Sequence, residues 1–80
     1  MNSTDIQRHI EELVAEEHRL LDAGGAGKSD EAAQRRLDEV NVELDRYYDL
    51  LRQRRARDEF AQDTESAHLR SADTVEKYLQ

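Results

Sequence analysis

This chain of 80 residues, with a formal net charge of -7 and no cysteine, can build one small core and has no disulfide to reinforce it. Hydrophobic residues make up 36% and charged residues 39% of the chain, so it can fold only if its apolar side chains gather on one face of each element. The acidic balance argues against bulk attraction to nucleic acid or anionic lipid. No segment approaches the roughly 20 apolar residues of a membrane span, and the N-terminus has no signal-peptide pattern, so we expect a soluble, cytoplasmic protein.

The first predicted helix covers residues 5–22. Thr4, with Gln7 three residues later, has the pattern of an N-cap with its capping-box partner. Apolar residues then recur at spacings that keep them on one side of a helix. They are Ile6, Ile10, Leu13, Val14, Leu20 and Leu21. The pattern stops at the Gly-rich segment 23–29, which is predicted to be a loop because glycine readily adopts the left-handed conformations that end helices.

A second, longer helix is predicted over residues 30–59. Ser29, followed by two acidic residues, is a typical helix start because it caps free amides and complements the helix dipole. Apolar residues then follow in steps of four and three, as in a coiled-coil heptad repeat. They are Ala33, Leu37, Val40, Leu44, Tyr47 and Leu51. The tail 60–80 completes a single domain, and Asp73, with Glu76 three residues later, predicts a short final helix over 73–79.

Two helices joined by a short loop most often pack antiparallel, so the sequence predicts an all-α helical hairpin. Folding at the loop makes the numbers of facing residues sum to about 52. Glu16 and Glu17 then come near Arg35 and Arg36. The side chains expected to form the seam between the helices are Ile6, Ile10, Leu13, Leu20, Leu37, Val40, Leu44 and Tyr47.

The second helix should overhang the first. At ~1.5 Å per residue, a helix over 5–22 is ~27 Å long and one over 30–59 is ~45 Å long, so the part beyond about Tyr48 has no counterpart in the hairpin. Either the tail folds back over this overhang or a second subunit covers it. Pairing of two hairpins into a helical bundle would supply the core that one hairpin lacks, so we expect a homodimer. The candidate residues for this contact are Tyr48, Leu50, Leu51, Arg52, Arg54, Arg55, Phe60, Tyr78 and Leu79.

The run "LLRQRRAR" at the overhang carries Arg52, Arg54, Arg55 and Arg57. Arginine clusters can bind phosphate, but at ~100° per residue these four side chains surround the helix instead of lining one face. Acidic residues also flank them, with Asp58 four residues after Arg54 and Glu59 four after Arg55. We therefore favour pairing with acids of the tail or a partner, and keep weak nucleic-acid or anion binding as the alternative.

The sequence gives little support for a metal site or an active site. His9, Glu12, Glu16 and His18 do not have the order that di-iron helical bundles use, and they are expected to be solvated. Tyr47 is expected in the seam with its hydroxyl at the edge. No motif unites a nucleophile with a base, and "GGAG" follows no strand. We predict no enzyme activity, no cofactor and no metal site.

The segments "VAEEHRLL", "VELDRYYDLLRQRRA" and "VEKYLQ" resemble the domain of unknown function 2630 family of high-GC Gram-positive bacteria. The resemblance runs nearly end to end. Members often have Trp where Tyr48 stands and Pro in the tail, where "SADTVE" has none. The resemblance supports treating the tail as part of the domain, and it implies no catalytic or binding residue. From the residues themselves we expect a small interaction or scaffold protein.

Overall fold

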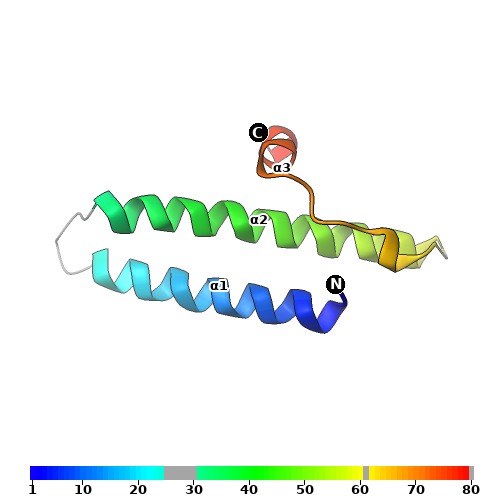
Figure 1. Cartoon of the computed structure of the whole chain (residues 1–80), viewed down its shortest axis with the longest axis horizontal. Coiled ribbons are helices and arrows are strands. Elements are labelled where there is room, and N and C mark those ends of the chain that lie inside the picture. Colours follow the sequence, from blue (N-terminus) through cyan, green and yellow to red (C-terminus); the bar gives the residue numbers. More distant parts are fainter. Residues whose placement is uncertain (25–30, 61, 80) are drawn as a thin grey trace.

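The computed structural model confirms an all-α hairpin followed by a short C-terminal helix (Figure 1). It describes residues 1–24, 31–60 and 62–79. Its elements are α1 (Ser3–Gly24), α2 (Glu31–Glu59), the 3₁₀ turn η1 (Thr64–Ser66) and α3 (Ala72–Leu79). Most of the predicted loop 23–29, with the Ser29 cap, lies outside the described residues. None of the helices within the described ranges is long and apolar enough to cross a membrane.

Helices α1 and α2 lie side by side and antiparallel (Figure 1). Their register is the predicted one, since Glu16 pairs with Arg36. The register is fixed by Arg36, whose Nε donates to Glu16 Oε2 at 2.6 Å and whose second terminal nitrogen donates to Glu16 Oε1 at 2.8 Å. These hydrogen bonds lower the pKa of Glu16 and raise the pKa of Arg36. Because the pair is exposed, it sets register more than it stabilises the fold.

The predicted seam is the core of the hairpin. Ile6, Val40, Leu44 and Tyr47 are buried, and the other four seam residues, Ile10, Leu13, Leu20 and Leu37, are half-buried. The heptad spacing of α2 therefore identified the face that packs on α1.

Two helix starts differ from the prediction, and in both a residue further upstream is the cap. Asn2, not Thr4, accepts a hydrogen bond from the Asp5 amide at 2.8 Å through its side chain, so α1 begins at Ser3. Ser71, not Asp73, accepts from the Thr74 amide at 3.2 Å, so α3 begins at Ala72. Asn and Ser are both strong caps, and several adjacent polar residues make the choice ambiguous from sequence. At its other end α1 reaches Gly24, two residues beyond the predicted end.

The tail of the same chain folds back over the overhang of α2. It returns along α2 and places α3 across that helix on the side away from α1 (Figure 1). Leu69 and Ala67 pack on the cluster formed by Ile6, Tyr47 and Leu50. Of the two alternatives for covering the overhang, the structure therefore shows the tail of the same chain. The overhang supplies part of the core.

Candidate functional site: the tail-binding cluster of α2

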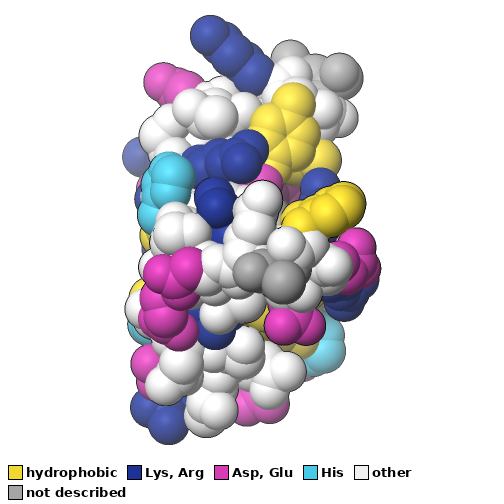
Figure 2. Space-filling model, turned by 90° about the vertical axis from the view of Figure 1, so that its right-hand side faces the viewer, with side chains coloured by type: hydrophobic (Ala, Val, Ile, Leu, Met, Phe, Trp, Pro, Cys, Tyr) yellow, Lys and Arg dark blue, Asp and Glu magenta, His cyan; other side chains and the backbone are white. Residues whose placement is uncertain are grey.

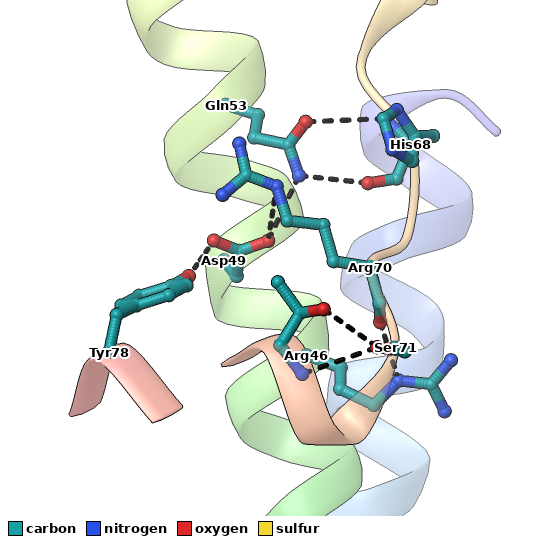
Figure 3. Close-up of polar contacts among 8 residues, drawn as sticks. Arg46, Asp49, Gln53, His68, Arg70, Ser71 and Tyr78 are labelled. Carbon is teal, nitrogen blue, oxygen red and sulfur yellow. Dashed lines mark hydrogen bonds and ion pairs between the residues drawn. The ribbon is translucent and has the colours of Figure 1, made fainter. Parts of the chain in front are cut away.

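Four polar side chains of α2 hold the tail, and we call them the tail-binding cluster; Figure 3 shows Arg46, Asp49 and Gln53. They are Arg46, Asp49, Gln53 and Arg54. The first three follow one another at spacings of three and four residues, so they lie on one side of the helix. This side differs from the seam that faces α1, and α2 is therefore packed on two sides.

Asp49 is the centre of the cluster, and only 4% of it is exposed. Its carboxylate accepts hydrogen bonds from Gln53 Nε2 at 2.9 Å and from the hydroxyl of Tyr78 on α3. Arg70 Nε lies 3.7 Å from Oδ2 and supplies a positive charge. A buried carboxylate is tolerated only when it is hydrogen-bonded and paired, and Asp49 meets both conditions through residues of the tail.

Gln53 pairs with the backbone of His68 through both ends of its amide (Figure 3). Its Nε2 donates to the His68 carbonyl at 2.8 Å, and its Oε1 accepts from the His68 amide at 3.4 Å. The side chain thus satisfies both backbone groups of one residue outside the helices, as a neighbouring strand would. Among the charged residues of this sequence none could do both, since Lys and Arg only donate and ionised Asp and Glu only accept.

The two arginines bind the tail on either side of this pair. Arg46 Nε donates to the Arg70 carbonyl at 2.9 Å. Arg54 donates to the carbonyls of Met1 at 3.1 Å and Thr64 at 3.2 Å, and it also pairs with Glu65 at 3.4 Å. Arg54 therefore joins the N-terminus, α2 and the tail at one guanidinium.

Asp49 and Gln53 also line a hollow of about 350 Å³ beside α3. Arg52, Ala56, Arg70 and Tyr78 complete its wall. The carboxylate in this wall is already bound by a hydroxyl, an amide and a guanidinium. The cluster thus attaches the tail to α2, and none of its four side chains is a free base or nucleophile.

Close to the cluster, α3 brings the carboxyl group of Glu76 against that of Asp45 on α2. Their hydrogen-bonding contact, with partial burial and the nearby negative charge, raises the pKa of Glu76. Glu76 Oε2 is buried and has no hydrogen-bond donor within the described part of the chain. Two carboxyl groups in contact can share one proton but repel each other once both are ionised.

Stability should therefore fall as pH rises through the raised pKa of Glu76. The folded protein binds the Glu76 proton more tightly than the unfolded chain, so the free energy of unfolding decreases with pH in this window. Replacing Glu76 with Gln removes the repulsion and leaves an amide that can donate to Asp45. At concentrations where the chain is a monomer, we expect the variant to melt at a higher temperature than the parent at pH 7, with the difference shrinking at pH 4. A difference that does not change with pH in thermal melts would contradict this.

Comparison with known proteins agrees with the sequence motifs. The family described as "Protein of unknown function (DUF2630)" matches residues 2–80. The chain belongs to this family. It is 47% identical over 73 residues to an uncharacterised protein of Mycobacterium bovis and to two uncharacterised proteins of Mycobacterium tuberculosis strains, with 88% of this chain and 82% of each relative covered. No solved structure matches the chain.

The structure places the contact residues expected for this DUF2630 chain in two groups. Leu50 is buried in the core, Leu51 packs against it, and Arg54 binds the tail. Arg54 pairs with Glu65 instead of Asp58, and no ion pair joins Arg55 to Glu59 in the described residues. The exposed group consists of Tyr48, Arg52, Arg55, Phe60, Tyr78 and Leu79.

The sequence patterns missed Asp49, Gln53 and Arg46 as tail-binding residues. A signal was present: Val42, Arg46, Asp49, Gln53 and Ala56 repeat at the same heptad spacing as the seam.

The patterns also missed His9, which is exposed but stacks on Tyr47 with ring centroids 5.1 Å apart. In the described ranges, no three His, Asp or Glu side chains are arranged to hold a metal ion.

Proposed function

We propose that this protein is a small cytoplasmic interaction or scaffold protein that self-associates and has no catalytic activity of its own. The observation that carries the proposal is the distribution of large hydrophobic side chains. Within the described residues six are exposed, which equals the number of hydrophobic side chains that are buried. The exposed ones are Met1, Leu21, Tyr48, Phe60, Tyr78 and Leu79.

This balance favours a protein that completes its core by association. A chain of 80 residues has a core worth only ~3–5 kcal/mol, and pairing with another molecule is a common way to add to it. Figure 2 shows hydrophobic side chains at the surface of the end that carries the overhang, among charged side chains of both signs. Phe60 is the most exposed, at 74%. Exposed aromatic residues bordered by charges are typical of protein contact surfaces.

The solution mass tests the proposal. We expect light scattering over a concentration series to give twice the chain mass of 9.3 kDa at micromolar concentrations. The series is measured at low and high salt, since salt screens exposed ion pairs but not apolar contacts. A mass of one chain at every concentration up to about 1 mM would overturn self-association.

The alternative function is weak binding of nucleic acid through the arginine run, and one observation bears on it. Arg52 and Arg55 remain exposed, whereas Arg54 is occupied by the tail. Two phosphate contacts would give a slope of about -1.8 for the logarithm of affinity against the logarithm of salt concentration. We expect no binding to duplex DNA or RNA at ~50 mM salt in a fluorescence anisotropy titration. Binding that is lost when both residues become Ala would favour the alternative.

A further inference from the structure

A third stripe of α2 lies outside both the seam that faces α1 and the tail-binding cluster. It consists of Asn41, Asp45, Tyr48, Arg52, Arg55 and Glu59, which follow in steps of four and three residues. Because each residue turns a helix by ~100°, this stripe lies between the seam and the tail-binding cluster. Asp45 is half-buried and the other five are exposed. The stripe therefore has the heptad spacing of a helix-packing face, but within the described residues only α3 reaches it, with Glu76 against Asp45 at its edge.

The charges of this stripe are unmatched within one chain. Arg52 and Arg55 form no ion pair among the described residues. Asp45 lies against Glu76, another acid, and no cation of the described chain is paired with either. Glu76 Oε2 is moreover buried without a donor. Two guanidinium groups without an ion pair thus lie on the same side of α2 as Asp45, which Glu76 of α3 joins without a cation.

We infer that a second copy of this chain packs on the stripe with its own stripe, antiparallel, about a two-fold axis midway between Tyr48 and Arg52. This inference rests on the proposed self-association and names its surface. In this arrangement Asp45 faces Arg55 of the second copy, and Tyr48 faces Arg52 of the second copy. Asn41 faces Glu59 of the second copy, and symmetry repeats each contact.

The antiparallel order brings opposite charges together at Asp45 and Arg55 and places no like charges in contact. Arg55 of the second copy brings the missing cation to Asp45 and Glu76, and Arg52 can lie over the ring of Tyr48 in a cation–π contact. A parallel order would instead place Arg52 on Arg52 and Asp45 on Asp45, which repel. The stripe contains two arginines and two acids and is locally neutral, whereas the whole chain has a charge of -7. Local neutrality favours another copy over an acidic partner such as nucleic acid.

A charge exchange tests the pairing of Asp45 with Arg55. The variant Arg55→Glu places two acids together in its own dimer, and Asp45→Arg places two arginines together. We expect each variant alone to raise the Kd of the dimer at least tenfold in analytical ultracentrifugation. An equimolar mixture of the two should regain the parent affinity, because the mixed dimer has one original pair and one reversed pair. Arg35→Glu is the control, since Arg35 is exposed on α2 outside the stripe.

A cross-linking experiment tests the orientation of the two copies. The chain has no natural cysteine, so only the introduced thiols can react. Asn41 and Glu59 are separated by ~27 Å along α2 at ~1.5 Å per residue. Only the antiparallel order brings Asn41 of one copy near Glu59 of the other. We expect a short bismaleimide to join Asn41→Cys to Glu59→Cys in a mixture, and to leave either variant alone largely unlinked.

The outcomes separate the inference from the proposed function. A parent protein that is monomeric at all concentrations would overturn both. A dimer whose Kd is unchanged by Arg55→Glu and by Asp45→Arg would overturn this surface and leave self-association standing. Efficient linking of Asn41→Cys to itself would overturn the antiparallel order. Far-ultraviolet circular dichroism of each variant ensures that a loss of association is not a loss of helix.

Discussion

Replacing Asp49 with Ala should release α3 and the preceding tail from α2 while the α1–α2 hairpin keeps its seam. The substitution removes the acceptor of two hydrogen bonds and the partner of Arg70. Hydrogen bonds to charged groups contribute ~1.5–3 kcal/mol, so we expect tail docking to weaken by ~2–3 kcal/mol. At ~1.4 kcal/mol per factor of ten, this corresponds to roughly 30- to 150-fold faster hydrogen exchange of the α3 amides.

The matched control is Asp58→Ala. Asp58 is an exposed acid of the same helix and forms no ion pair within the described residues, so its loss should change stability by less than ~0.5 kcal/mol. Exchange should accelerate in α3 far more than at Val40 and Leu44, which lie in the seam. Equal acceleration throughout the chain would show that the tail and hairpin unfold as one unit. No acceleration in α3 would show that Asp49 does not hold it.

The hairpin could be predicted from sequence because its determinants are local and periodic. Val40, Leu44 and Tyr47 recur at a heptad spacing, and burial of such a face is the most favourable use of these side chains. The register followed from the loop position alone, and the pair of Glu16 with Arg36 confirms it. Neither inference needed knowledge of the tail.

The tail-binding cluster could not be predicted in the same way. Arg46, Asp49 and Gln53 are polar, and a polar stripe on a helix usually faces solvent. Arg46 and Gln53 are bound by the segment 67–71, which has no periodic pattern and meets them through its backbone carbonyls and amide. Backbone groups are the same in every residue, so the sequence of the tail does not reveal which of its residues are bound.

The same reasoning explains why the arginine run was ambiguous. Arg54 and Arg52 are two residues apart and point in different directions on α2. One is enclosed by the N-terminus and η1, and the other remains in solvent. The run thus serves two purposes, since its enclosed member fastens the tail and its exposed members lie on the stripe that we assign to a second copy.

Replacing Ile6 with Ala should unfold much of the protein. Ile6 has no exposed surface and packs on Tyr47 and Leu50, where hairpin and overhang share one core. Truncating a buried Ile to Ala costs ~2–5 kcal/mol, because transfer free energy is lost and a cavity remains. A domain of this size has only ~3–5 kcal/mol of stability. We expect urea unfolding, followed by circular dichroism at low micromolar protein, to show that about half or more of the variant is already unfolded without urea.

Leu21→Ala is the matched truncation, on the same helix but at a side chain that is 52% exposed. Its expected cost is below ~0.5 kcal/mol, so its urea midpoint should stay close to that of the parent. Because only folded chains associate, raising the protein concentration should partly restore the Ile6→Ala variant through mass action. A midpoint equal to that of Leu21→Ala would mean that Ile6 adds nothing to the core. Concentration-independent midpoints would instead separate folding from self-association.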